Sequence, residues 1–518
     1  MKKVLVVCFF SLGVFSSLKA NNIAVSNVTL KNRNTISDYV SVSFDLSWEN
    51  SFRKSTGSSN WDAAWVFVKY KIGATGEWKH ATLNTTGHTI PSLGASTQTD
   101  GTGIFLYRNT TGNGTFTLNG VELRWNYGTD GVPDESKIYV KVFAIEMIYI
   151  PEESFYVGSG GQTDNGNYKS NDGEFRQAND VSSTGLATIF LINSTPPTIQ
   201  GNNISSNINN LTAFNGINLD LGTTTGTASL ASGFPTGYYG FYAMKYEITQ
   251  GQYSDFLNTL TYNQQEHRIT NSPGALSGTG AFDSPGSYRN SIEISISGKA
   301  VGIPALFGCD LNNNDVYNES SDGNWIACNY ISWQDLTAFL DWAALRPLTE
   351  LEYEKICRGP LSPVQDEYPW GNTIIKGIGN ILNAGQPNET SNTNGANTNM
   401  ESIFTDGPLR VGIFATSTSN RKDAGSSYYG AMEMGGNVWE QLIGINSSVG
   451  RNFSGTPGNG ILDSNGDANT TDWPDYTGSI LRGGSWAHTV FSLRTSDRLF
   501  ELKKNELRLP DYGGRGGR

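Results

Sequence analysis

Three short segments of this 518-residue chain carry the signature of a helix start, and they constrain the fold more than any other feature. In each segment a hydroxyl residue stands three positions before a side chain that can reach back to it, the arrangement called a capping box. The boxes are Thr249 to Gln252, Ser332 to Asp335 and Thr349 to Glu352. The first two are followed by apolar residues at helical spacing: Tyr253, Phe256, Leu257 and Leu260, then Leu336, Phe339, Leu340 and Ala343.

Each predicted helix is short. Arg346-Pro347 ends the second one and Gly359 the third, because proline excludes helical geometry before it and glycine suits a helix end. Only 16% of the residues are charged, which favours short strands and ordered loops over exposed helices. The sequence therefore predicts an α+β domain with few helices.

The first part of the chain reads as strands separated by turns. The clearest predicted strands are Val40–Trp48, Trp65–Ile72, Thr115–Trp125 and Lys137–Phe143. No useful helical periodicity occurs there, so residues 21–143 are predicted to form an all-β, sandwich-like domain that precedes a second domain over 144–518. Residues 159–232 are poor in charge and rich in Gly, Asn, Ser and Thr, which predicts a low-complexity insertion.

The N-terminus is typical of a secretory signal peptide. Lys2 and Lys3 precede a short apolar run that ends at Ala20, and a polar stretch begins at Asn21. We expect residues 1–20 to be removed and the protein to be exported to the periplasm, cell surface or medium. No other segment approaches the length of a membrane span. The net charge of −12 argues against nucleic acid as a partner, because phosphate binding needs a basic surface.

Three cysteines remain after such a cleavage: Cys309, Cys328 and Cys357. Cys309 and Cys328 flank one acidic loop and could pair as a disulfide. Three buried thiols acting as small apolar side chains are an equally good interpretation.

A series of motifs in the second domain resembles the sulfatase-modifying-factor, or formylglycine-generating enzyme, family. They run in the family's order: Met147–Pro151 with Phe155 and Gly158, Glu247–Thr249 with Tyr253 and Phe256, Ser332–Trp342, Arg346–Gly359, Pro369–Gly371, Gly430–Glu440, Leu481–Trp486 and Gly513–Arg515. The resemblance implies a fold related to C-type lectins. Most of these residues also have structural explanations as core tryptophans or turn glycines, so the resemblance by itself does not establish activity.

The chain departs from the family at its catalytic segment. Active members carry two copper-binding cysteines after the Gly-Gly-Ser motif, whereas Ala487–Arg494 and all later residues contain none. Because a thiolate pair is what binds Cu(I), we expect no copper, and the favoured interpretation is a protein without enzymatic activity. A related branch uses iron bound by a separate histidine-bearing domain, but the four histidines here are scattered.

Calcium is the predicted metal. Alternating oxygen ligands occur at Asp310, Asn312, Asn314, Val316 and Asn318, with Glu319 and Asp322 beyond, and a second run spans Asp463 to Asn469. Asx turns without an ion are the alternative for both runs. The family resemblance implies another site at Glu433, Gly436, Val438 and Glu440, and a looser one at Asn380 and Ile381 with Asp406.

The ligand surface is predicted after Trp486, where the resemblance places the family's substrate cleft. Its candidate residues are His488, Phe491, Leu493, Arg494, Arg498 and Leu499. The favoured function is a non-catalytic module that binds an unknown protein or glycan. The alternatives are an oxidoreductase of the same family, a catalyst using Glu350, Glu352 and Glu354, a component of a bacterial surface or gliding apparatus, and a receptor diversified by a retroelement.

Overall fold

The computed structural model describes residues 22–98, 100–158, 176–177, 190–202, 217–220, 226–401, 405–416, 418–498 and 506–518. The predicted signal peptide at 1–20 and most of the predicted insertion at 159–232 lie outside these ranges.

The helices begin where the capping boxes predict. Helices α1 (Gln250–Leu257), α3 (Trp333–Trp342) and α4 (Glu350–Arg358) all have both hydrogen bonds of the box, and Gly359 caps α4 with a φ of 67°. Helix α2 (Tyr262–Arg268) was not predicted, although Thr261 and Gln264 form a capping box of their own. The remaining turns of helix are α5 (Ser448–Arg451), η3 (Ser287–Arg289), η4 (Tyr476–Gly478) and η5 (Val490–Leu493). Within the described ranges, no helix is both long and apolar enough to cross a membrane.

Strands dominate the rest of the fold. The largest sheet has the order β18-β24-β15-β8-β3-β6-β5, with β4 paired to β3. Its strands are β3 (Asp62–Ile72), β4 (Lys79–His80), β5 (Gly94–Gln98), β6 (Ile104–Arg108), β8 (Ile138–Ile150), β15 (Phe241–Met244), β18 (Arg346–Pro347) and β24 (Gly516–Gly517). A three-stranded sheet, β1-β2-β7, is made of β1 (Ala24–Asn34), β2 (Tyr39–Arg53) and β7 (Gly112–Trp125).

The smaller sheets have two to four strands each. A four-stranded sheet contains β10 (Arg176–Gln177), β12 (Ile199–Asn202), β13 (Ile217–Asp220) and β14 (Gly226–Ala228). The three pairs are β9 (Phe155–Val157) with β11 (Phe190–Ile192), β16 (Ile292–Ile296) with β17 (Leu306–Cys309), and β19 (Ile381–Leu382) with β20 (Thr390–Ser391). A last sheet joins β21 (Trp439–Ile443), β22 (Ser479–Arg482) and β23 (Tyr512–Gly513).

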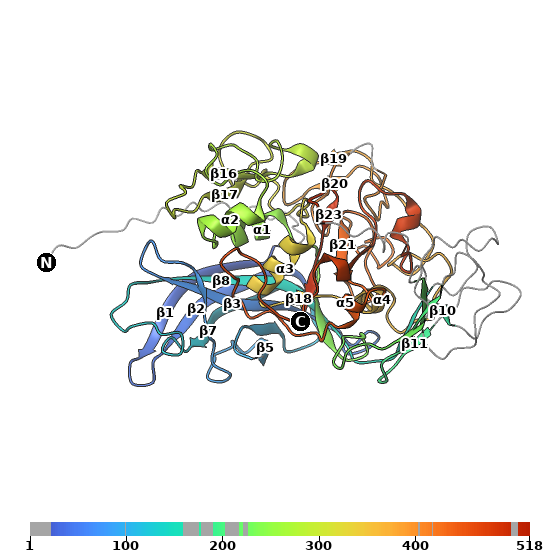
Figure 1. Cartoon of the computed structure of the whole chain (residues 1–518), viewed down its shortest axis with the longest axis horizontal. Helices are drawn as coiled ribbons and strands as arrows, with labels where there is room; N and C mark the ends of the chain where they lie inside the picture. Colours follow the sequence, from blue (N-terminus) through green and yellow to red (C-terminus); the bar gives the residue numbers. More distant parts are fainter. Residues whose placement is uncertain are drawn as a thin grey trace, which may run out of the picture.

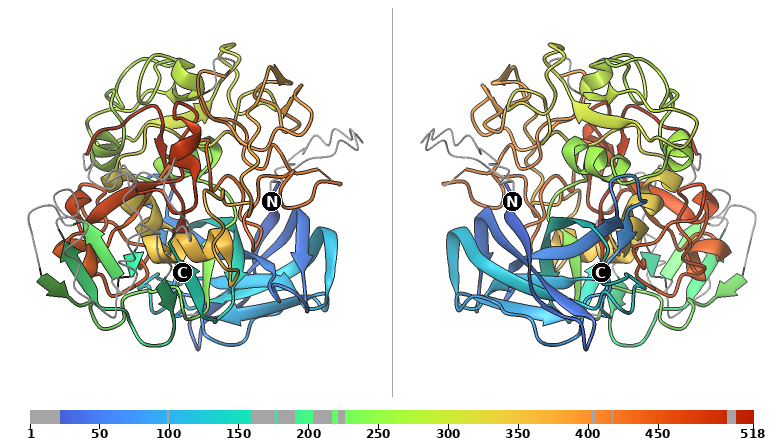
Figure 2. Two further views of the ribbon diagram at one scale, coloured as in Figure 1. Left: turned by 90° about the vertical axis from the view of Figure 1, so that its right-hand side faces the viewer. Right: turned by 90° about the vertical axis from the view of Figure 1, so that its left-hand side faces the viewer.

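The N-terminal region consists of antiparallel sheets, and β1-β2-β7 packs against β3 and β6. Alternate residues of both sheets share one core, including Phe44 and Leu46 of β2, Val66 of β3 and Leu118 of β7. Figures 1 and 2 show these blue and cyan strands gathered at one end of the molecule.

One sheet joins the N-terminal region to the rest of the chain. Strand β8 crosses residues 143 and 144, where the sequence suggested a boundary, and pairs with β3 on one side and β15 on the other. Strand β3 has apolar residues on both its faces, and some of them contact α3. The Trp65 indole donates to the Ala343 carbonyl at 2.8 Å. The Phe67 ring packs edge to face on Trp342, with ring centroids 5.1 Å apart. Helix α3 therefore lies against this sheet, as both views in Figure 2 show.

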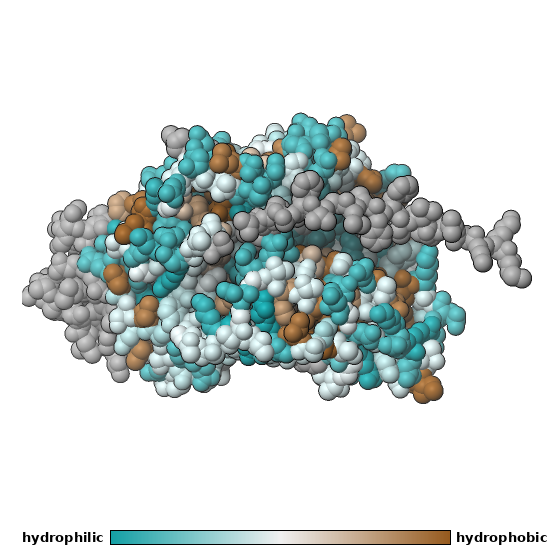
Figure 3. Space-filling model, turned by 180° about the vertical axis from the view of Figure 1, so that it is seen from behind, coloured by the Kyte–Doolittle hydropathy of each residue, from teal (hydrophilic) through white to brown (hydrophobic). Residues whose placement is uncertain are grey.

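Figure 3 shows the molecule from behind the view of Figure 1. In Figure 3 the apolar residues of the described part are scattered in small groups among polar ones.

Candidate functional site

The segment after Gly483-Gly484-Ser485-Trp486 is only partly at the surface. Leu493 is fully buried with Tyr368 and Trp370, and the buried Arg498 donates to both oxygens of Glu350, at 2.6 and 2.9 Å. The sequence expectation that these two residues form an exposed surface is therefore wrong: one is needed for packing and the other for charge compensation. Leu499 lies outside the described residues.

The buried arginines also account for the carboxylates of helix α4. Glu350 pairs with Arg498 and Arg482, and Glu354 pairs with Arg482 at 2.9 Å and with Arg358 at 3.1 Å. Glu352 forms the α4 capping box and pairs with Arg346. All three carboxylates are buried. Buried, paired carboxylates of this kind fix the position of a helix and leave no group accessible to a substrate.

His488 is held by Ser485 and Asp511. Its Nδ1 lies 2.7 Å from Ser485 Oγ and 3.4 Å from Asp511 Oδ2, and Ser485 Oγ also donates to that carboxylate oxygen at 3.2 Å. Its ring packs edge to face on Trp439 at 4.8 Å. Ser485 is fully buried, and both partners meet the same ring nitrogen. The arrangement orients the imidazole and does not present a nucleophilic hydroxyl.

Among the described residues of this segment, the exposed ones are Ala487, Thr489 and the aromatic Phe491. Phe491 is 47% exposed on η5, and the Arg494 guanidinium lies over its ring at 4.9 Å while pairing with Asp366 at 3.1 Å. Tyr288 is 40% exposed and packs on Trp486, with ring centroids 5.6 Å apart. We call Tyr288, His488 and Phe491 the aromatic surface. Sequence reasoning missed Tyr288 because it comes from η3, about 200 residues earlier in the chain.

Glu433 and Glu440 lie in one buried charged cluster with Glu247 and Arg515. Arg515 pairs with Glu440 Oε1 at 2.7 Å, while Glu433 Oε1 accepts from the Gly412 amide at 2.9 Å. The Oε2 atoms of Glu433 and Glu440 are both buried without a hydrogen-bond partner. Burial raises the pKa of Glu433 to about 7.

These two unsatisfied carboxylate oxygens are compatible with a bound calcium ion, since hard cations take oxygen ligands. Between them, Gly436 has a left-handed φ of 92°, which favours glycine. The amide of Val438 donates to Glu247 Oε1 at 3.1 Å.

The 310–318 loop contains the Asx turns that the sequence offered as an alternative to calcium. Both Asp310 oxygens accept loop amides, from Asn314 at 3.1 Å and Asp315 at 2.8 Å. Asn314 Oδ1 accepts from the Val316 amide at 2.8 Å, and Asn318 Oδ1 from the Cys309 amide at 3.0 Å. The amide group of Asn312 donates to Ser321 at 2.8 Å. The alternating residues are therefore used within the loop, and do not all point to one centre.

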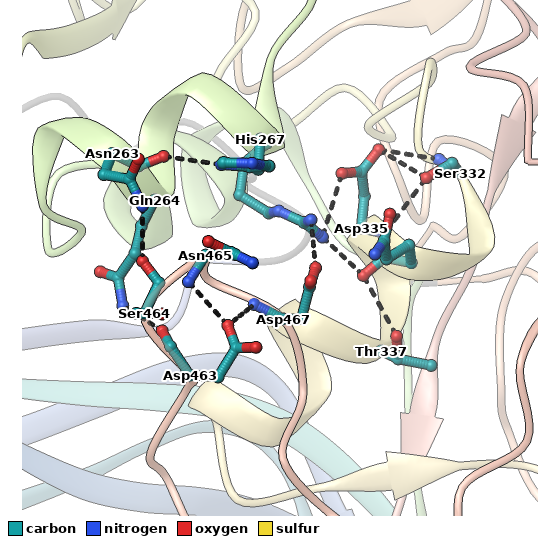
Figure 4. A network of polar contacts seen from close by, with 12 residues as sticks. Asn263, Gln264, His267, Ser332, Asp335, Thr337, Asp463, Ser464, Asn465 and Asp467 are labelled. Atoms are coloured by element: carbon teal, nitrogen blue, oxygen red, sulfur yellow. Dashed lines mark hydrogen bonds and ion pairs between the residues drawn. The ribbon is translucent and has the colours of Figure 1, made fainter.

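The second predicted calcium loop, Asp463 to Asn469, also uses its polar side chains in hydrogen bonds and ion pairs. Asp463 Oδ1 accepts from the amides of Asn465 and Asp467, at 2.8 and 2.9 Å (Figure 4). Asp467 pairs with the buried Arg268, and Asn469 Oδ1 accepts from Asn459 at 2.9 Å.

The looser predicted calcium site is also dispersed. Ile381 belongs to β19, the Asn380 carbonyl accepts from the Asn392 amide at 3.0 Å, and Asp406 is exposed. Over the ranges that the structure describes, no three His, Cys, Asp or Glu side chains are arranged as a ready-made metal centre.

The three cysteines are buried thiols, and no disulfide joins Cys309 to Cys328. Burial raises the pKa of Cys309 to about 12, and raises the pKa of Cys328 and Cys357 as well. Since the thiolate is the form that binds soft metals and attacks electrophiles, these residues are poor candidates for either role.

The fold and site define a mixed α+β protein whose motif residues build buried ionic clusters and whose aromatic side chains at Tyr288, His488 and Phe491 are partly exposed. Residues 234–513 match the sulfatase-modifying factor enzyme 1-like domain, and the chain belongs to this family. The match begins after the Met147–Gly158 motif, so that motif rests on the resemblance alone.

Two curated relatives are distant. Hercynine oxygenase from Mycolicibacterium smegmatis is 30% identical over 171 residues, which cover 33% of this chain and 32% of the relative. Formylglycine-generating enzyme from Thermomonospora curvata is 32% identical over 111 residues, which cover 21% of this chain and 31% of the relative. The aligned part thus spans about a third of each relative's length.

Proposed function

We propose that this chain is an exported, non-catalytic binding module on the family's lectin-related fold, with a protein or glycan ligand at the aromatic surface and calcium as a stabilising ion. The observation that carries the proposal is the placement of the thiols. The sequence has no cysteine after Cys357, and Cys309, Cys328 and Cys357 are all buried with raised pKa values. A Cu(I) site needs accessible thiolates, which this chain does not offer near Ser485.

The side chains at and beside the segment where the family has its cysteines are of kinds that suit ligand binding. Phe491 and Tyr288 expose aromatic rings, and Arg494 stacks on Phe491. Aromatic and arginine side chains contribute most of the energy in many interfaces because they bury large areas at little entropic cost. His488 is oriented by buried partners, which reduces the cost of ordering it on binding.

Calcium would be held by the orphaned oxygens of Glu433 and Glu440, with carbonyl oxygens of Gly436 and Val438 as the neutral ligands. An ion at this place would relieve repulsion among Glu247, Glu433 and Glu440, whose mutual charges oppose ionisation. Because only the folded chain brings these groups together, binding would stabilise it by mass action.

The catalytic alternative is tested directly. Purified protein is incubated with a sulfatase-type cysteine peptide, copper and oxygen, and the peptide is weighed by mass spectrometry. We expect no conversion to formylglycine, and conversion at the rate of an authentic enzyme assayed alongside would refute the proposal.

The binding surface is tested on a glycan array with the double variant His488→Ala/Phe491→Ala. We expect it to lose the glycans that the unmodified protein binds while its melting temperature changes little, because both side chains are partly exposed. Leu382→Ala, at an exposed site elsewhere, is the matched control and should bind normally. Binding that survives the double variant would place the ligand on another surface.

A further inference from the structure

A second buried acidic cluster lies apart from the Glu433–Glu440 cluster. Glu293 belongs to β16, Asp310 follows β17, and Asp322 lies twelve residues further along the loop. The exposed fractions of these residues are 1%, 1% and 0%. Pairing of Glu293 with Gly308 across the β16–β17 ladder brings the first carboxylate beside the start of the loop.

The charges that act on Glu293 are all negative. They come from Asp310, Asp315 and Asp322, and together with burial they raise the pKa of Glu293 to about 7. Asp310 and Glu319 act on Asp322 in the same sense. In the part of the chain that the structure describes, no lysine, arginine or histidine forms an ion pair with Glu293, Asp310 or Asp322. The ionic clusters around Glu350 and Glu440, by contrast, each contain arginine.

Two oxygens in this acidic cluster have no hydrogen-bond partner. Glu293 Oε1 and Asp322 Oδ1 are both buried and unsatisfied, although the other Asp322 oxygen accepts from the Glu319 amide at 2.6 Å. A buried carboxylate oxygen without a donor is costly, and three mutually repelling carboxylates make the cost larger. A bound cation would satisfy both oxygens and cancel the repulsion.

We propose that the unsatisfied oxygens of Glu293 and Asp322 bind a calcium ion beside Asp310, whose two oxygens stay bonded to loop amides, and that its remaining ligands are backbone carbonyls of the 310–322 loop and water. Calcium accepts about six to eight oxygen ligands in flexible geometry, whereas magnesium keeps a near-ideal octahedron with several waters. The irregular loop, partly or fully exposed from 311 to 321, offers amide and carbonyl oxygens together with access for water, which suits the larger ion.

The test compares Glu293→Gln and Asp322→Asn with the unmodified protein by calcium titration calorimetry. We expect each variant to lose one equivalent of calcium or to bind it at least tenfold more weakly. Glu266→Gln, which removes the same charge from an exposed position of α2, should titrate like the unmodified protein. Glu433→Gln should retain this equivalent, which separates the loop from the calcium site of the proposed function.

The sign of the stability change distinguishes a cation site from a structural role. In chelator, both variants should melt at the same or a higher temperature than the unmodified protein, because they remove repulsion. In millimolar calcium they should melt lower. Unchanged calcium titrations, or lower melting in chelator, would overturn the proposal.

A measurement on the unmodified protein covers the case in which the variants do not fold. Calcium should slow hydrogen exchange of the amides between 310 and 322. Unchanged exchange there at saturating calcium would also overturn the proposal.

Discussion

Lys245 links the N-terminal sheets to the family domain through buried ion pairs, and its replacement by methionine should lower the free energy of unfolding. Its ammonium group donates to Glu146 Oε2 at 3.1 Å, to Asp62 Oδ2 at 3.2 Å and to the Asn50 carbonyl at 3.2 Å. All three side chains of this ionic cluster are buried. Removing one partner from a buried ion pair costs about 3–5 kcal/mol, because the remaining charge is left without compensation.

Glu146 is the carboxylate that is most destabilised when the Lys245 ammonium group is removed. Asp62 keeps hydrogen bonds from the Trp48 indole, the Ser51 hydroxyl and the Phe52 amide, whereas Glu146 Oε1 has no partner. Burial raises the pKa of Glu146 from 4.5 to about 7 even with Lys245 present. The protonated form is thus favoured by folding, and this stabilisation is complete below pH 4.5 and is lost as the pH rises through 7.

The Lys245→Met variant should therefore be destabilised more at pH 8 than at pH 5.5, where Glu146 can take up a proton. Urea unfolding followed by circular dichroism at the two pH values measures the difference. The double variant Lys245→Met/Glu146→Gln should recover part of the lost unfolding free energy at pH 8. The control Lys79→Met, at an exposed position, should change the unfolding free energy by less than about 0.5 kcal/mol. A cost below about 1 kcal/mol at pH 8, or equal costs at both pH values, would refute this account.

Three further outcomes are expected. Gly359→Ala should destabilise the protein by about 1–3 kcal/mol in calorimetry, because its φ is 67° and a Cβ would come within 2.3 Å of the Tyr428 ring; an unchanged melting temperature would show that the α4 end can adjust. In chelator, the unfolding free energy should fall as the pH rises from 4.5 to about 7, since the pKa of Glu433 is raised to about 7, and Glu433→Gln should reduce that slope; equal slopes would contradict the assignment. Mass spectrometry of exported protein should find an N-terminus near Asn21, and an intact Met1 would contradict the predicted cleavage.

Helices and strands could be predicted from the sequence where the interactions that form them join residues only a few positions apart. Capping boxes at Thr249, Ser332 and Thr349 fix helix starts through hydrogen bonds that span three residues, so α1, α3 and α4 could be placed without tertiary information. The box at Thr261 is of the same kind and went unrecognised because its helix has little apolar periodicity. Strands β2, β3, β7 and β8 were predicted from alternation and turn residues, which act over a few positions, whereas β1, β5 and β6 were not predicted.

The domain boundary illustrates the opposite case. The change in residue pattern near 143 and 144 is real, yet β8 runs through it because hydrogen bonds with β3 and β15 extend the strand on both sides. Strand pairing between segments about 100 residues apart is decided by tertiary packing, which composition does not encode.

The sequence by itself determined the family, the positions of the main helices and the absence of cysteine from the segment where a copper site would need it. Only the tertiary structure decided which polar residues are accessible. It buried Arg498 against Glu350 and Leu493 against Trp370, and it left Phe491 exposed on the same segment. It also placed Glu293 within the electrostatic influence of Asp322, and no basic residue of the described ranges pairs with either carboxylate. The reason is physical: burial and charge compensation depend on every neighbour in space, and most of those neighbours are distant in sequence.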